Sequence, residues 1–205
     1  DWSDTGECHS VRNTQRHTGR IYRIAYGSPQ RPELNLAAAT SGELVNLQKH
    51  RNDWIVRHAR RRLQERSAAG VDMSEAHATL RSMFASESDV PRKLRALWAL
   101  HSIEGLDERT LVKLLDHESE HVRTWAIQLL VESRFRGTRQ SPVVTIDLSR
   151  SGHVSPAALS RFRELASTDP SPQVRLYLAS ALQRLAYSQR WPIAEVLALH
   201  EEDDS

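Results

Sequence analysis

The stretch Val122-Arg123-Thr124-Trp125-Ala126-Ile127-Gln128-Leu129-Leu130 decides the fold class of this chain. Its apolar residues Val122, Trp125, Ala126, Leu129 and Leu130 recur three and four positions apart, which is the spacing of one face of an α-helix. The segment 174–185 repeats the pattern, and less complete versions lie around Val56, Leu94, Ala76 and Leu111. The sequence therefore predicts an all-α protein.

Helix start signals agree with this periodicity. Thr40-Ser41-Gly42-Glu43 and Asp72-Met73-Ser74-Glu75 have the form of capping boxes, and Ser155-Pro156 and Ser171-Pro172 place proline at the first helical position. We expect helices, mostly in pairs, near 40–49, 53–67, 73–86, 90–104, 107–115, 119–133, 156–167, 172–187 and 192–200. Trp98 and Trp125 fall in the apolar stripes, so we expect both in the core.

The chain divides into an N-terminal segment, 1–32, and a helical region, 33–200, followed by an acidic tail, 201–205. Within the first segment, residues 19–27 suit a half-buried strand, and the prolines of 28–32 indicate a linker. The residues 134–154 lack helical periodicity, which predicts an insertion between the third and fourth helix pairs. The expected helix 192–200 would cover the last pair.

Composition excludes several classes of protein. The chain has 205 residues, 39% of them hydrophobic, and a single cysteine, so a disulfide scaffold and a cysteine-rich zinc site are excluded. The formal net charge of +2 argues against an obligate polyanion binder. No apolar run is long enough to span a bilayer, so we expect no membrane insertion. Because the sequence begins at Asp1 without a methionine, we expect it to be part of a longer protein.

An aspartate and an arginine recur in the helix pairs. Each turn between the two helices holds an Asp, and each second helix carries an Arg beside its first core aliphatic residue; the set is Asp53, Arg57, Asp89, Arg95, Asp116, Arg123, Asp169 and Arg175. From about 40 to 187 this resembles the HEAT repeat, a helical hairpin that stacks into an armadillo-like α-α superhelix. The resemblance implies a solenoid of about four hairpins, in which these eight residues form hydrogen bonds between neighbouring repeats. Their unequal spacing departs from a regular superhelix.

The segment His117-Glu118-Ser119-Glu120-His121 matches H-E-x-x-H, a zinc-peptidase signature. The chemistry needs both histidines on one continuous helix, with the glutamate beside a zinc-bound water. Here the motif falls at a predicted turn, with Ser119 as the cap of the next helix. We therefore keep a zinc hydrolase that uses His117, Glu118 and His121 only as a remote alternative, and expect neither a metal nor another cofactor.

Two further segments could carry a function. The run 58–66 is the strongest basic feature, and helical repeats can bind nucleic acid through phosphate contacts. Consecutive helical residues point about 100° apart, however, so Arg60, Arg61 and Arg62 fan out instead of forming one stripe. Cys8-His9 and His17 could suggest a metal or haem site, but covalent haem attachment needs C-x-x-C-H. We expect a solvated helix face for the first segment and a polar loop for the second.

The order of segments gives a second resemblance. Asp1 to His9, then Gly19-Arg20-Ile21-Tyr22-Arg23-Ile24, then prolines, then hairpins with Asn52-Asp53-Trp54-Ile55-Val56-Arg57 resemble the large membrane-bound, quinoprotein-like dehydrogenases of planctomycetes and related bacteria. That family implies a β-propeller whose closing strand would be 19–27, then HEAT-like repeats, often followed by a cytochrome c-type domain. It also implies an extracytoplasmic location, periplasmic or at the cell surface. No catalytic residue of the family has a counterpart here.

These observations favour one function over the alternatives. We expect a non-catalytic helical-repeat scaffold that mediates contacts between domains, or between proteins, within a larger dehydrogenase. The alternative is a nucleic-acid-binding module that uses the basic helix. A protein, or a neighbouring domain of the same chain, is the expected partner.

Overall fold

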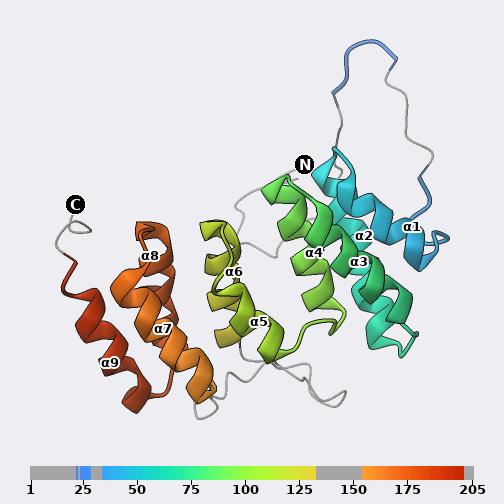
Figure 1. Ribbon diagram of the computed structural model, residues 1–205. Helices are drawn as coiled ribbons and strands as arrows, with labels where there is room; N and C mark the ends of the chain where they lie inside the picture. The colour runs from blue at the N-terminus through green and yellow to red at the C-terminus, as the bar shows by residue number, and fades with distance from the viewer. Residues whose placement is uncertain (1–21, 23, 29–33, 133–153, 201–205) are drawn as a thin grey trace, which may run out of the picture. The chain divides into compact units, whose positions relative to one another are not determined.

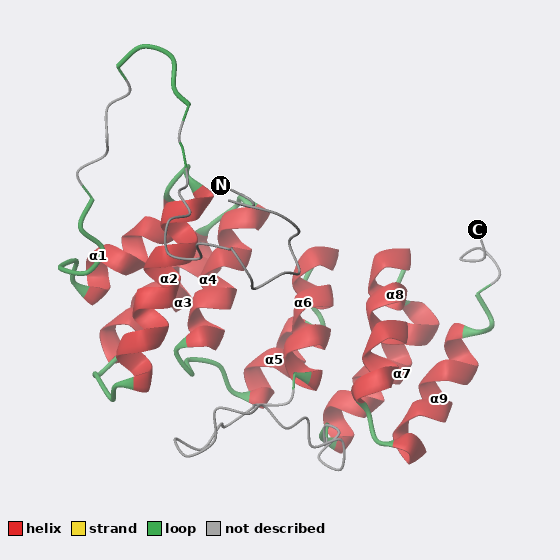
Figure 2. Ribbon diagram, turned by 180° about the vertical axis from the view of Figure 1, so that it is seen from behind, coloured by secondary structure: helices red, strands yellow, loops and turns green. Residues whose placement is uncertain are grey.

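The computed structural model describes residues 22, 24–28, 34–132 and 154–200 (Figure 1). Every regular element in these residues is helical (Figure 2), which confirms the all-α prediction. The helices are α1 (Ser41–Asn46), η1 (Leu47–Lys49), α2 (Asp53–Ala68), α3 (Ser74–Ser86), α4 (Val90–Ser102), α5 (Glu108–Leu114), α6 (Glu120–Val131), α7 (Pro156–Thr168), α8 (Pro172–Ala181), η3 (Leu182–Arg184) and α9 (Tyr187–Leu197). The chain forms two compact units, Asp1–Asn35 and Leu36–Ser205, and all of these helices belong to the second.

Consecutive helices of the second unit pack as pairs: α1 with α2, α3 with α4, α5 with α6, and α7 with α8. The second helix of each pair also contacts the second helix of the next, so α2 packs on α4, α4 on α6, and α6 on α8. First helices meet in the same way at α1 and α3 and at α5 and α7, and α9 packs on α7 and α8. We call the row formed by α2, α4, α6 and α8 the second-helix row.

Local sequence explains where most helices begin. The side chain of Thr40 accepts a hydrogen bond from the Glu43 amide and the Glu43 carboxylate accepts one from the Thr40 amide, which is the predicted capping box. Ser155 and Ser171 cap α7 and α8, each with proline in the first helical turn, as predicted. The side chain of Asp89 caps α4 by accepting from the Arg92 amide. These contacts satisfy amides that a helix start leaves without a partner.

Three local predictions were wrong. Met73, which has no side-chain cap, precedes α3, and Asp72 instead accepts from the amide and hydroxyl of Ser74 two residues on, so no capping box forms there. The last helix is Tyr187–Leu197 rather than 192–200, with Pro192 inside it, because Ala186 already ends the preceding turn in an extended conformation. As a result, α8 ends at Ala181 and only a 3-10 turn follows it.

The N-terminal strand is also absent from the described part of its range. Residues 22 and 24–28 contain no strand, and the side chains of Tyr22, Ile24 and Tyr26 are exposed. A strand is stable only when it is paired and has a buried face, and these residues have neither. The rest of the predicted segment 1–32, including Cys8, His9 and His17, lies outside the described residues, as do the tail 201–205 and the predicted insertion 134–154 apart from Val154.

The apolar stripes meet in two core clusters. One joins the first two pairs and reaches Val122 and Leu129 of α6, and the other joins α6 to α7, α8 and α9 around the fully buried Phe162. Trp98 and Trp125 pack against the first cluster but are only half-buried, so the prediction that both are core residues was wrong.

Candidate binding groove

The strongest contact among the recurring Asp and Arg residues joins the third and fourth pairs. Arg123 on α6 donates from Nε and Nη2 to the two carboxylate oxygens of Asp169, at 2.7 and 2.8 Å. Both side chains are buried, with 11% and 2% of their surfaces exposed. The arginine also donates to the carbonyls of His117 and Glu118, so its remaining nitrogen is satisfied. This two-pronged pair ties α6 to the turn before α8.

The first two pairs are joined in the opposite sense. Arg95 on α4 donates to Asp53 at 3.4 Å and to the carbonyl of His50 at 3.0 Å, so here the arginine reaches back to the preceding turn. Arg57 contacts the same carboxylate at 2.7 Å from within its own helix. Asp53 therefore carries two arginine partners.

The remaining residues of the set, Asp89, Asp116 and Arg175, contact groups of other kinds. Asp89 serves as the cap of α4, and Arg175 donates to the backbone carbonyl of Asp169 in its own turn. Asp116 pairs with Arg161 of α7, an arginine that the sequence comparison did not single out. Within the described residues, no Asp–Arg bridge of the set joins the second pair to the third. Asp–Arg contacts of the set thus join helix pairs at two junctions, in opposite senses.

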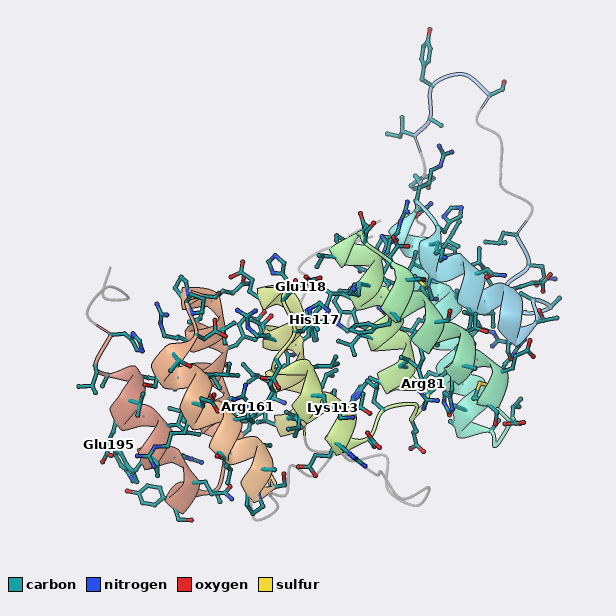
Figure 3. The ribbon with its side chains drawn as sticks, viewed as in Figure 1. Arg81, Lys113, His117, Glu118, Arg161 and Glu195 are labelled. Atoms are coloured by element: carbon teal, nitrogen blue, oxygen red, sulfur yellow. The ribbon has the colours of Figure 1, made fainter. Side chains whose placement is uncertain are left out.

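The H-E-x-x-H segment straddles a helix start. His117 and Glu118 lie in the turn between α5 and α6, and α6 begins at Glu120 (Figure 3). The His117 Nδ1 accepts a hydrogen bond from the Ser119 amide, while His121 is exposed on the first turn of α6. Ser119 occupies the cap position, but its side chain makes no capping bond. Burial lowers the pKa of His117, and nearby Lys93 lowers it further.

Metal-ligating side chains do not converge elsewhere in the described residues. No group of three or more histidine, cysteine, aspartate or glutamate side chains in that part of the chain is placed to hold a metal ion. The two histidines of the motif lie on different segments, so they do not present the paired ligands that the zinc chemistry needs.

The arginines of the basic run go to different places. Arg61 and Arg62 both pair with Glu65, and Arg66 donates to Ser41 Oγ and to the carbonyl of Ala39. Arg60 alone turns toward α4, where its guanidinium carbon lies 5.4 Å from the centre of the Trp98 ring. The fan-like arrangement expected from helical geometry is confirmed, and it separates Arg60 from its neighbours.

Arg60 and Trp98 belong to a groove along α2, α4 and α6. The groove has a volume of about 850 Å³, within the range of ligand-binding sites. Its lining combines apolar, aromatic and charged side chains: Asp53, Arg57, Arg60, Pro91, Leu94, Arg95, Trp98, His101, Trp125, Gln128, Leu129 and Glu132. We call this hollow the tryptophan groove. It spans the second helices of the first three pairs, and its lining includes both partners of the Asp53–Arg95 bridge.

The two indoles form an edge-to-face pair in the groove, with ring centres 4.9 Å apart and planes at 68°. At one end of the lining, His101 Nε2 lies 2.8 Å from the Glu132 carboxylate. Two nitrogens of the lining, Nη1 of Arg60 and Nε1 of Trp98, are buried and have no hydrogen-bond partner. Burial also lowers the pKa of the Arg60 guanidinium.

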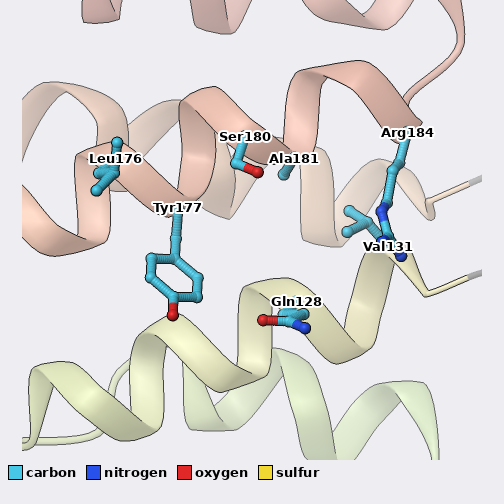
Figure 4. A pocket seen from close by; sticks show the side chains of 7 residues that line it. All are labelled: Gln128, Val131, Leu176, Tyr177, Ser180, Ala181 and Arg184. Atoms are coloured by element: carbon cyan, nitrogen blue, oxygen red, sulfur yellow. The ribbon is translucent and has the colours of Figure 1, made fainter. Parts of the chain in front are cut away.

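A second hollow continues along the second-helix row between α6 and α8. Its volume is about 360 Å³, and Tyr177 and Ser180 of α8 face Gln128 of α6 across it (Figure 4). Leu176 at its edge is 65% exposed. Gln128 lines both hollows, so the two share a wall on α6.

The sequence did not predict this groove, because its residues follow patterns that are typical of a helix core or of an exposed helix face. Trp98 and Trp125 occupy apolar stripe positions, and Arg60 sits among exposed arginines. None of the helices in the described residues is both long and apolar enough to cross a membrane. Comparisons with known protein families, curated proteins and solved structures found no match for this chain.

Proposed function

We propose that this chain is a non-catalytic helical-repeat scaffold, an armadillo-like α-solenoid, that binds a protein segment along its second-helix row. Three observations support the arrangement: the helices pack in pairs, second helices contact each other in chain order, and Arg–Asp contacts join neighbouring pairs at two junctions. A single hairpin leaves an apolar face uncovered, and the next hairpin covers it, which is the logic of a repeat protein.

The observation that carries the binding function is the tryptophan groove. Two half-buried indoles lie in a concave surface with charged groups around them. Tryptophan and arginine are the residues that most often dominate the energy of protein interfaces. A surface row made from consecutive second helices also offers an extended site, which suits a segment of polypeptide better than a small molecule.

The wider setting of the scaffold follows from the sequence resemblance. We propose that it connects domains of a larger, quinoprotein-like dehydrogenase outside the cytoplasm, with a protein or a neighbouring domain as its partner. The separation of the two histidines in the H-E-x-x-H segment supports a structural role for that turn rather than a hydrolytic one.

An unbiased selection tests the binding function. A library of random dodecapeptides displayed on phage is selected against the full chain, and the affinities of the enriched peptides are measured by titration. The variant Gln128→Trp places an indole where the two hollows meet, and Gln64→Trp makes the same change at an exposed position of α2.

We expect the selected peptides to bind Gln128→Trp about tenfold more weakly than wild type, because overpacking costs about 1–3 kcal/mol. Binding to Gln64→Trp should stay within about twofold. Enrichment of no peptide, or equal binding to both variants, would contradict the proposal. So would tight binding of duplex DNA that weakens steeply with salt, since that behaviour marks a nucleic-acid module.

A further inference from the structure

We propose that the tryptophan groove binds an acidic protein segment, with one carboxylate of the segment held by Arg60 and an apolar side chain packed against Trp98 and Trp125. This inference rests on the proposed function and names the chemistry of its partner.

The unpartnered donors of the groove call for an acceptor. Arg60 Nη1 and Trp98 Nε1 are both N–H donors, and both are buried without a partner in the lining of the same hollow. A buried donor without an acceptor is costly, and a carboxylate oxygen is the strongest acceptor that a protein segment offers. A modest turn of the Arg60 side chain toward the groove would exchange an unpaired nitrogen for a charge-assisted hydrogen bond.

Charge in the groove points the same way. Three arginines and two carboxylates line it. Arg57 and Arg95 share the Asp53 carboxylate, and the Glu132 carboxylate lies against His101, so each of these groups has a polar partner within the lining. Arg60 makes no ion pair with any described residue and lies against an indole face instead. Burial lowers the pKa of Arg60, and repulsion from Arg57 and Arg95 lowers it further against the attraction of Asp53.

The apolar part of the lining gives the segment a second anchor. The indoles of Trp98 and Trp125 stand edge to face, and Leu94 and Leu129 form the floor beneath them. An apolar side chain that enters this hollow loses contact with water, at a gain of about 25 cal/mol per Å² of apolar surface. An acidic residue next to an aliphatic or aromatic one therefore matches the groove better than either alone.

The two carboxylates of the lining argue for a protein segment over a nucleic acid. Single-stranded nucleic acid also combines negative charge with flat rings that stack on tryptophan. A phosphate backbone, however, carries a charge at every nucleotide and would pass both Asp53 and Glu132 in this groove. A segment with one well-placed carboxylate avoids that repulsion.

Fluorescence anisotropy with designed probes tests the inference. The probe is a fluorescein-labelled dodecapeptide with two Asp-Leu units between Gly-Ser flanks. Matched peptides carry Asn-Leu or Lys-Leu in place of Asp-Leu, and a labelled thymidine dodecanucleotide is the fourth probe. The proteins are the full chain, Arg60→Met and Arg61→Met. Methionine keeps an unbranched apolar stem over Trp98, and Arg61 is an exposed neighbour on the same helix that serves as the matched control.

We expect the Asp-Leu peptide to bind wild type about tenfold more tightly than the Asn-Leu peptide, because a hydrogen bond to a charged group contributes about 1.5–3 kcal/mol. Arg60→Met should abolish that preference, whereas Arg61→Met should change the affinity less than about twofold. Arg60→Lys, which keeps the charge but loses the planar fork, should retain a reduced preference and serves if the methionine variant does not fold.

Other outcomes overturn the inference in distinguishable ways. Equal binding of the Asp-Leu and Asn-Leu peptides, with both weakened by Gln128→Trp, would remove the acidic preference and leave the proposed function standing. Equal losses in Arg60→Met and Arg61→Met would show general charge attraction instead of a site. Tighter binding of the oligonucleotide would assign the groove to nucleic acid. If no probe binds, the acidic segment is excluded, and the unbiased selection alone decides whether the scaffold binds peptides.

Discussion

The junction between the third and fourth helix pairs carries a buried ion pair beside a hollow of about 360 Å³, whereas the junction between the second and third pairs contributes to the larger tryptophan groove. At the first, Arg123 and Asp169 lock α6 to the turn before α8. At the second, Trp98 of α4 contacts Trp125 of α6 edge to face, and the described residues supply no Asp–Arg bridge. Two junctions built from the same sequence pattern therefore differ in their contacts: one has a buried Asp–Arg pair, and the other has an aromatic pair that lines a groove.

The two junctions differ because different carboxylates lie within hydrogen-bond distance of each arginine. Arg123 binds Asp169 because α6 packs on α8, which begins just after that residue. Arg95, one pair earlier, is already engaged by Asp53 and the His50 carbonyl behind it, so it leaves Asp116 to Arg161 of α7. A recurrent residue predicts a position on the helix, but the packing around it determines the partner.

Removing the Arg123–Asp169 pair between the third and fourth helix pairs should have the largest effect on the free energy of unfolding. Arg123→Ala leaves the Asp169 carboxylate buried without its two-pronged partner, which should lower the free energy of unfolding by about 3–5 kcal/mol. Urea unfolding followed by circular dichroism measures the change. Arg57→Ala at the equivalent repeat position is the control, because its pair with Asp53 is exposed; it should cost less than about 1 kcal/mol. Equal losses in the two variants would refute the distinction between the junctions.

The connection between α4 and α5, which contains Gly105, should give the second largest change in the free energy of unfolding. A Cβ at Gly105 would lie 2.7 Å from His77 Cδ2 and 2.9 Å from Leu100 Cδ2, so Gly105→Ala forces side chains of α3 and α4 apart. We expect a loss of about 1–3 kcal/mol by urea unfolding. Gly42→Ala, in α1 with open space around it, should instead be neutral or slightly stabilising. If Gly105→Ala left the free energy of unfolding unchanged, α3 and α4 would have to accommodate the added methyl group without cost.

The same connection offers a stabilising change. Glu104 has φ of 59°, and it ends α4 in the position where glycine is usual, with the Gly105 amide bonded to the Leu100 carbonyl. Glu104→Gly should raise the free energy of unfolding by about 1 kcal/mol, because the left-handed conformation strains any residue with a Cβ. Glu104→Ala keeps the Cβ and should give no gain. Thermal melts of wild type, Glu104→Gly and Glu104→Ala measure the change in stability. If Glu104→Ala were also stabilised, backbone strain would be ruled out as the cause.

The smallest effect should be a pH dependence at His117. Burial lowers the pKa of His117 in the folded protein, followed by the repulsion of Lys93 and Arg123 against the attraction of Glu118. The folded state therefore favours the neutral ring, whose Nδ1 accepts from the Ser119 amide. Stability from this site is present above the usual histidine pKa of about 6.5 and is lost as pH falls below it.

The measurement compares urea midpoints of wild type and His117→Gln at pH 7.5 and 5.5. Acidification should lower the midpoint of wild type more than that of the variant, because glutamine has no proton to take up. The variant keeps every other histidine, so their contributions cancel in the comparison. An equal drop in both would exclude His117 as the source.

Much of the local structure was predictable from the sequence. The spacing of Val122, Ala126 and Leu129 predicted α6, and Thr40, Ser155 and Ser171 predicted three helix starts, because these signals act within one turn. The capping box predicted at Asp72 was wrong, because an aspartate side chain can accept a hydrogen bond from the amide two residues later instead of capping a helix.

What the sequence by itself determined is the set of helices and the residues that recur in each pair, since periodicity and caps depend on neighbours along the chain. Only the tertiary structure decided that Arg123 meets Asp169, that Arg95 reaches back to Asp53, and that Trp98 and Trp125 line a groove instead of filling a core. The physical reason is that burial and ion pairing depend on the distance between helices, which is set by the volumes of side chains far apart in sequence.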